Sequence, residues 1–214
     1  MRAIRKGSEP LELSRYRAAG NTEYDGPNFT PVKGAIRTAL LEEQGWLCAY
    51  CMTRIDENVK VEHWHCRSNK VYKGEQIDYG NMLGVCTGNR GGAPKEQHCD
   101  ERKGDGDIKF NPANPAHHPR LAISYSINGE IRSDDANFNR ELDERLNLNH
   151  AKLINNRRAV SDEVIKCLNK SAGCRTRAEV DRMVHGWKTP DRRGRLQEYC
   201  DVAVFFLEKR RKRL

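Results

Sequence analysis

The chain lacks any stretch suited to anchoring in a membrane or to directing secretion. Its longest uninterrupted apolar run, 202–207, is far too short to span a bilayer. The opening residues 1–6 lead into polar residues, where a secretory leader would have an apolar run. We therefore expect no membrane partner and a cytoplasmic setting, in which the 8 cysteines are metal ligands or free thiols more often than disulfides.

Apolar and acidic residues are also scarce. Hydrophobic residues make up 37% of the 214 positions and charged residues 32%, which predicts a modest core and a heavily charged surface. A small core of this kind favours a metal as an additional cross-link. Lys and Arg (38) outnumber Asp and Glu (30), so the formal charge of +8 favours a polyanionic partner, although many soluble basic proteins have none.

Periodicity and turn signals predict an α+β fold. Residues 1–29 are polar and indicate either a flexible leader or a partner-docking arm, with the leader favoured. Thr30-Pro31 is typical of an N-cap followed by proline at the first helical position, and Gly45 of a helix end. Further along, the patterns predict a strand over 59–62, a loop and strand over 77–85, a loop over 87–98 and a helical turn after Cys99.

A proline- and asparagine-rich segment, 111–119, marks the expected domain boundary. Beyond it, Asn128-Gly129 predicts a β-hairpin, and helical patterns cover 153–168, the segment after a Thr176/Glu179 capping box, and 196–207. The expected organisation is an N-terminal arm (1–29), a small metal-stapled domain (30–112) and a mainly helical region with one hairpin (113–214). A basic tail, 209–213, is either solvated or contacts nucleic acid.

Cysteine spacing predicts a structural zinc site. Cys48 and Cys51 form a C-x2-C pair, which supplies two thiolates from one tight turn, and Cys86 and Cys99 are the natural partners. The second pair is stretched by an insert, so either member could instead be a buried thiol. Competing ligands are His65, Cys66 and His98. The three remaining cysteines lie on helical patterns and are expected to fill the core: Cys167, Cys174 and Cys200.

Between the cysteine pairs lie residues suited to phosphodiester hydrolysis. His63 could accept a proton from water at neutral pH, and the carboxylates of Glu62 and Asp100 suit a hard divalent cation such as Mg²⁺ or Mn²⁺. Because neighbouring residues of a strand face opposite ways, Glu62 and His63 are expected at a strand end or turn. A solvated Glu-His pair is the commoner explanation of such a dipeptide taken alone.

This order of residues resembles the HNH (ββα-metal) endonucleases that carry a four-cysteine zinc site. The resemblance implies that His63 is the general base, that Glu62 and Asp100 bind the catalytic metal, and that Asn81 braces the loop. Lys103 falls where the family has a lysine near the phosphate. Asp100 is a departure, because asparagine or histidine is usual at that position.

A wider set of runs resembles the PtuB family, the HNH effector subunits of Septu anti-phage systems that also accompany some retrons. They are residues 1–6 with 9–11, 48–51, 61–64, 81–86, 98–100 and 146–149. The resemblance implies an effector that works beside a PtuA-like ATPase, and in some cases with a retron RNA/DNA assembly. It leaves the substrate open between DNA and tRNA.

Two other classes of function remain open. A zinc-knuckle module that binds nucleic acid without catalysis would keep the cysteines and the basic charge. A thiol-redox protein would instead use Cys48 and Cys51 as its active pair.

Overall fold

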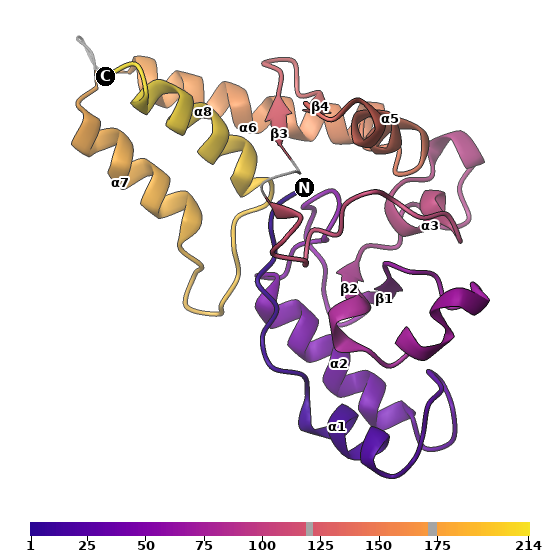
Figure 1. Ribbon diagram of the computed structural model, residues 1–214. Coiled ribbons are helices and arrows are strands. Elements are labelled where there is room, and N and C mark those ends of the chain that lie inside the picture. The colour runs from indigo at the N-terminus through magenta and orange to yellow at the C-terminus, as the bar shows by residue number, and fades with distance from the viewer. Residues whose placement is uncertain (119–121, 171–174) are drawn as a thin grey trace.

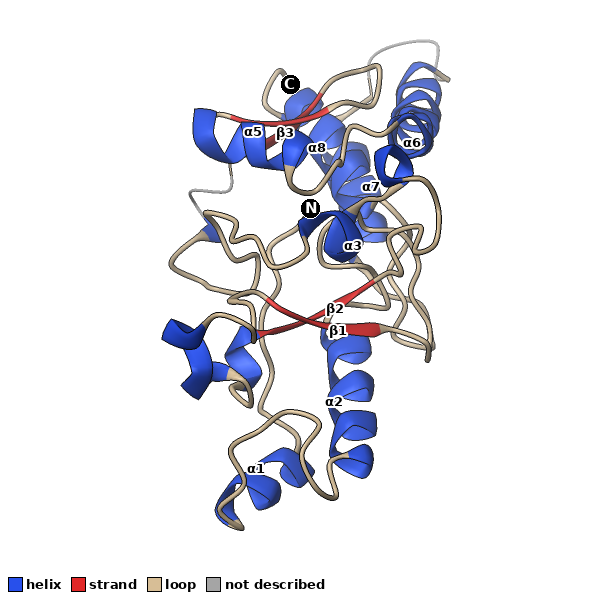
Figure 2. Ribbon diagram, turned by 90° about the vertical axis from the view of Figure 1, so that its right-hand side faces the viewer, coloured by secondary structure: helices blue, strands red, loops and turns tan. Residues whose placement is uncertain are grey.

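The computed structural model describes residues 1–118, 122–170 and 175–214 (Figure 1). The fold is α+β, as predicted: helices surround two small antiparallel hairpins (Figure 2). The helices are α1 (Leu11–Ala18), α2 (Thr30–Glu43), α3 (Cys99–Lys103), α5 (Ala136–Glu144), α6 (Ala151–Asn169), α7 (Arg177–Lys188) and α8 (Cys200–Arg211). Short 3-10 turns cover Lys70–Glu75, Tyr79–Asn81 and Pro94–Glu96.

The first hairpin joins β1 (Lys60–His63) to β2 (Met82–Val85), with Glu62 opposite Leu83 and His63 opposite Met82. Its strands are the predicted ones shifted by about a residue, and β1 ends at His63, as expected for the Glu-His pair. Helix α3 follows β2 after the insert 87–98, which forms a loop with one 3-10 turn, also as predicted. The order is therefore strand, strand, helix.

Helix α2 supports this hairpin from one side. Its buried residues recur at three- and four-residue steps (Val32, Ile36, Leu40, Leu41), which is why the segment is helical and amphipathic. The helix starts at Thr30 and its N-cap is Phe29, so the predicted cap is displaced by one residue. Gly45, at φ +62°, follows its end as predicted.

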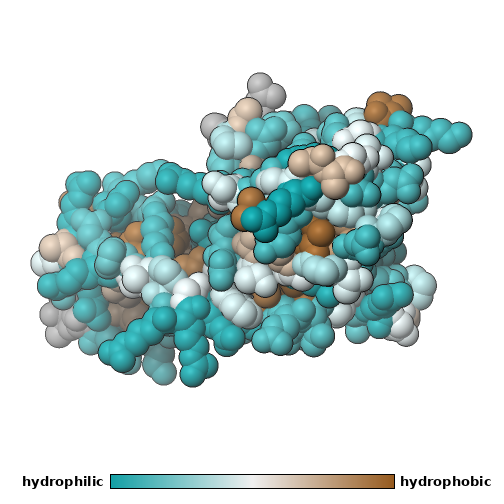
Figure 3. Space-filling model, turned by 90° about the horizontal axis from the view of Figure 1, so that it is seen from below, coloured by the Kyte–Doolittle hydropathy of each residue, from teal (hydrophilic) through white to brown (hydrophobic). Residues whose placement is uncertain are grey.

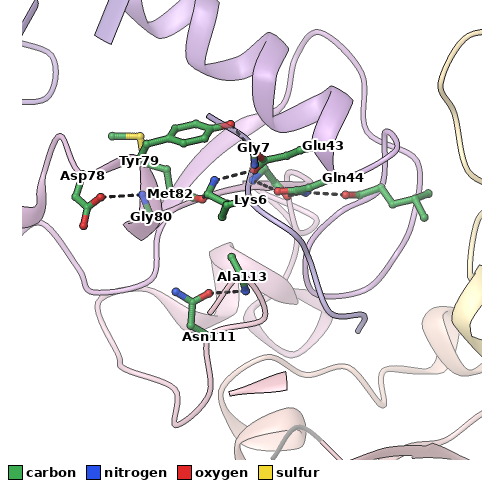
Figure 4. Close-up of polar contacts among 12 residues, drawn as sticks. Lys6, Gly7, Glu43, Gln44, Asp78, Tyr79, Gly80, Met82, Asn111 and Ala113 are labelled. Atoms are coloured by element: carbon green, nitrogen blue, oxygen red, sulfur yellow. Dashed lines mark hydrogen bonds and ion pairs between the residues drawn. The ribbon is translucent and has the colours of Figure 1, made fainter. Parts of the chain in front are cut away.

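The N-terminal segment is packed, so the expectation of a flexible leader is wrong. Met1 and Ile4 are each 2% exposed, and the Ile4 amide donates to the carbonyl of Pro112. Lys6 Nζ lies 2.7 Å from Glu43 Oε1 and donates to the carbonyl of Met82 (Figure 4). The segment thereby ties α2, the first hairpin and residue 112 together. Met1 and Ile4 belong to the same apolar cluster, but two buried residues are too few to produce a sustained apolar period.

The predicted second hairpin is present as β3 (Ile123–Tyr125) and β4 (Ile131–Ser133). Gly129, at φ +91°, sits so close to the α6 carbonyl of Ile154 that a Cβ would lie 2.2 Å from it. Arg157 of α6, 1% exposed, donates to the carbonyls of Gly129 and Leu148. The capping box of α7 is formed by Thr176 and Glu179, as predicted.

The largest apolar cluster runs from Met1 through the cysteine-rich segment to Val202, so it includes residues on both sides of the expected boundary at 112. The division into a nuclease domain and a helical region stays a prediction. Cys200 lies in this cluster, Cys167 is only half-buried, and Cys174 falls outside the described residues.

Across the described ranges, no helix has both the length and the apolar character needed to cross a membrane. One face of the molecule is largely hydrophilic with small apolar patches (Figure 3).

Candidate metal centre and adjoining cleft

The four predicted cysteines converge on one point. Their sulfur atoms all lie within 4.8 Å of one another, with Cys48 Sγ 3.9 Å from Cys99 Sγ and Cys51 Sγ 3.8 Å from Cys86 Sγ. Zinc bonded to four thiolates at about 2.3 Å needs sulfur–sulfur edges of about 3.8 Å. Disulfide sulfurs would lie about 2 Å apart. The group therefore fits a tetrahedral metal such as zinc.

The local backbone conformation positions both pairs of cysteines. Cys48 and Cys51 sit in a turn closed by the Met52 amide donating to the Cys48 carbonyl, with Met52 at φ +66°. Cys86 directly follows β2. Cys99 opens α3 at φ +55°, and its amide donates to the carbonyl of Leu146 in the C-terminal region.

The three competing ligands lie outside this group. His98 Nδ1 is 3.2 Å from Cys99 Sγ, a position from which it can donate to a thiolate and so support the metal indirectly. His65 pairs with Glu75 at 2.6 Å and stacks on Tyr72. Cys66 Sγ instead lies 2.9 Å from a carboxylate oxygen of Asp105.

Glu62 is held by groups that the cysteines position. Its carboxylate, in a residue 6% exposed, accepts from the Tyr50 hydroxyl at 3.2 Å and lies 2.7 Å from Lys103 Nζ. Tyr50 stands between Cys48 and Cys51, and Lys103 lies on the helix that Cys99 opens. A metal on the four thiols would therefore fix this carboxylate indirectly.

The protonation of Glu62 is strongly perturbed. Burial and a hydrogen bond with Asp100 raise the pKa of Glu62 to about 8, against the opposing charge of Lys103. Burial also opposes ionisation of Asp100, but hydrogen bonds from Glu62 and Lys60 outweigh it and lower the pKa of Asp100. Burial and Asp100 therefore favour the protonated form of Glu62, whereas Lys103, 2.7 Å away, favours its ionised form.

His63 faces a different set of neighbours. Its Nε2 is 2.9 Å from the carbonyl of Gln76, and its ring meets Tyr24 edge-on. Since a carbonyl only accepts, Nε2 carries the proton and Nδ1 is left as the basic atom. Burial lowers the pKa of His63 to about 4, so the ring is neutral at physiological pH.

Asn81 spans the base of the loop between the strands. Its Oδ1 accepts from the His65 amide at 2.8 Å, and its Nδ2 donates to the carbonyls of His65 and Glu75. The Tyr72–His65 stack and the His65–Glu75 pair close the same loop. The loop that carries the carbonyl partner of His63 therefore has a fixed base.

Glu62, His63 and Asp100 border one cleft of about 420 Å³. Its rim includes Arg67 and Asp105. Lys60 also lines it and pairs with Asp100 and Glu101. Sequence reasoning missed Lys60 and Tyr50, although both carry a signal: Lys60 precedes Glu62 by two residues on a strand, and so shares its face, and Tyr50 lies inside the C-x2-C motif.

Among the described residues, the four cysteines are the one group of three or more His, Cys, Asp or Glu side chains gathered closely enough to hold an ion. Glu62, His63 and Asp100 do not form a second such group. No protein-family model matches the chain, and no curated protein matches it.

Replacing Tyr50 by Phe tests the link between the cysteine turn and Glu62. Loss of a hydrogen bond to a buried, ionisable group should lower the free energy of unfolding by about 1–2 kcal/mol while the metal stays bound. Urea unfolding and metal analysis check this. Replacing the partly exposed Tyr72 by Phe is a control, because no bond to Glu62 is lost. Equal destabilisation of both variants would contradict the link.

The depressed pKa of His63 predicts a pH-dependent stability. The unfolded histidine binds a proton near pH 6.5 and the folded one only near pH 4, so the stability it contributes above pH 6.5 is lost as the pH falls to 4. Wild type should lose about 3 kcal/mol more over this range than His63→Gln. Urea titrations at several pH values measure it. The exposed His185→Gln should track wild type, and parallel curves for His63→Gln and wild type would refute the prediction.

Proposed function

We propose that the protein is a zinc-stapled, divalent-metal-dependent nuclease of the HNH (ββα-metal) type. The observation that carries the proposal is the joint position of Glu62, His63 and Asp100 around one cleft, on a strand–strand–helix unit braced by the four cysteines. The positive charge of the chain supports a polyanionic substrate.

In this proposal His63 is the general base. Its Nδ1 takes a proton from the attacking water, while the Gln76 carbonyl holds the ring in the required tautomer. Lys103, buried beside Glu62, balances the charge of that carboxylate. Asn81 keeps the loop and Gln76 in place. The products are expected to carry a 5′ phosphate.

Glu62 and Asp100 would hold the catalytic Mg²⁺ or Mn²⁺, which would polarise the phosphate and stabilise the leaving 3′ oxygen when bound. Two carboxylates are a sufficient protein contribution, because Mg²⁺ usually keeps several waters. Binding would favour the ionised form of Glu62, because a carboxyl group binds a metal when it is deprotonated. Lys60, partly exposed, would move off Asp100 to make room.

The biological setting rests on the sequence resemblance alone. We propose an effector of an anti-phage defence system that acts with a PtuA-like ATPase, with a retron RNA/DNA assembly as a further partner. DNA and tRNA are the candidate substrates, because water activated by a histidine does not need a 2′-hydroxyl.

Direct assay tests the proposal. The purified protein, with and without a PtuA-like ATPase, is incubated with plasmid DNA and with bulk tRNA in Mg²⁺, in Mn²⁺ and in EDTA. Cleavage that needs a divalent cation and leaves 5′ phosphates is expected. Intact substrates in every arm, from protein that retains its zinc, would reject the nuclease.

A specific observation favours a second candidate, a zinc-knuckle module that binds nucleic acid without cleaving it. Lys60 and Lys103 pair with Asp100 and Glu62, so the carboxyl groups are already neutralised without a metal ion. Binding of the same nucleic acids with no dependence on Mg²⁺, and no cleavage, would establish this module.

A further inference from the structure

A groove of about 460 Å³ lies where the β3–β4 hairpin, the end of α6 and the end of α8 meet. This part of the molecule is well separated from the β1–β2 hairpin in both ribbon views (Figures 1 and 2). The groove is therefore distinct from the cleft that contains Glu62.

Its floor is apolar and mainly aliphatic. Ile165 and Leu168 come from α6, Phe206 from α8 and Ile127 from the hairpin turn. Ile127 is 57% exposed and lies beside the other apolar side chains of the groove. Covering these groups would remove apolar surface from water and favour association, at roughly 25 cal/mol per Å².

Positively charged residues from the C-terminal end also line the groove, and no acidic residue of the described chain lies opposite them. They are Lys209, Arg210 and Arg213. None of the three forms an ion pair within the described residues. By contrast, their neighbour Arg211 pairs with Asp181 on α7, away from the groove. The charge on the groove side is therefore free to attract an anionic group.

We propose that this groove binds an acidic amphipathic segment of a partner protein. Bulky aliphatic side chains of the segment would enter the floor, and its Asp or Glu residues would face the wall of cations. A nucleic acid fits less well, because bases stack on open aromatic faces. Two aromatic residues line the groove: Tyr125 is 6% exposed and Phe206 is partly buried, and the other apolar residues are aliphatic. This assignment does not rest on the nuclease proposal and gives part of the basic tail a different role from nucleic-acid contact.

Selection from a random peptide library displayed on phage, against the immobilised full chain, tests the groove. Enriched peptides should combine Asp or Glu with Leu, Ile or Phe. The affinity of a selected peptide, measured by fluorescence anisotropy, should fall about tenfold or more in Ile127→Ser and in Lys209→Glu.

Each variant has a matched control. Leu11→Ser removes an aliphatic side chain that is 58% exposed outside the groove, and Lys166→Glu reverses an exposed charge on α6 outside it. Both should bind the peptide as wild type does. Absence of acidic-aliphatic enrichment, or affinities indifferent to both groove substitutions, would overturn the proposal. Tighter binding of oligothymidylate that the same two variants abolish would assign the groove to nucleic acid and also overturn it.

Discussion

Replacing Cys99 by Ser should release the metal and destabilise the whole chain. Cys99 is fully buried, its sulfur lies among three others, and its amide is bonded to Leu146 of the C-terminal region. Structural zinc binds zinc-finger peptides with about 10–16 kcal/mol, so loss of one ligand should lower the free energy of unfolding by more than about 5 kcal/mol. Metal analysis of purified protein and urea unfolding followed by circular dichroism measure both effects.

Cys66→Ser and Cys167→Ser are the matched controls, because both thiols lie outside the metal group. Both variants should retain stoichiometric zinc, and mild reductant should not remove it from wild type. A Cys99→Ser protein that keeps its zinc and unfolds like wild type would show that the four sulfurs do not act together. Loss of zinc to mild oxidation with gain of a Cys48–Cys51 disulfide would instead favour the thiol-redox protein.

His63→Ala should reduce the rate of nucleic-acid cleavage about 10³-fold, the range expected for removal of a general base. The substitution leaves β1 in place, since strand pairing of His63 with Met82 involves the backbone. It also removes an edge-on contact with Tyr24, so some loss of stability is expected. Initial rates in Mg²⁺, compared at a temperature where circular dichroism shows both proteins folded, measure the effect.

The exposed His185→Ala on α7 is the control and should cleave at the wild-type rate. Imidazole added to the assay should restore part of the activity of His63→Ala, because a small base can enter the space that the side chain vacates. A folded His63→Ala protein with full activity would remove His63 from the mechanism while leaving the metal centre intact.

The cysteine group was predictable because spacing limits how thiols can meet: C-x2-C forms a turn, and the second pair follows a strand and opens a helix. The strand and hairpin positions followed from alternation and from Asn128-Gly129. The packing of residues 1–29 was not predictable, because α1 buries only Leu13 and Tyr16, too few to show a period. Helix α5 was also missed, although Asp135 caps it and Phe138 and Leu142 are spaced by one turn.

The candidate cleft was predictable only in part. Adjacent positions in sequence suggested that Glu62 and His63 act together, yet their contacts diverge: Glu62 meets Tyr50 and α3, and His63 meets Tyr24 and Gln76. Lys60 pairs with Asp100 because β1 lies beside α3. The sequence does not show which strand will take that place. Such contacts between distant segments are set by tertiary packing, and the sequence shows only that Lys60 and Glu62 share one face of a strand.

The insert between Cys86 and Cys99 also connects two parts of the fold. Asn147 donates to the insert carbonyls of Lys95 and Gln97, and His150, which caps α6, pairs with Glu96. The start of α6 and the turn before it are therefore bonded to the insert that joins Cys86 to Cys99, and Asp100 directly follows that insert on α3. The helical C-terminal region and the candidate cleft are thus linked by a continuous set of polar contacts.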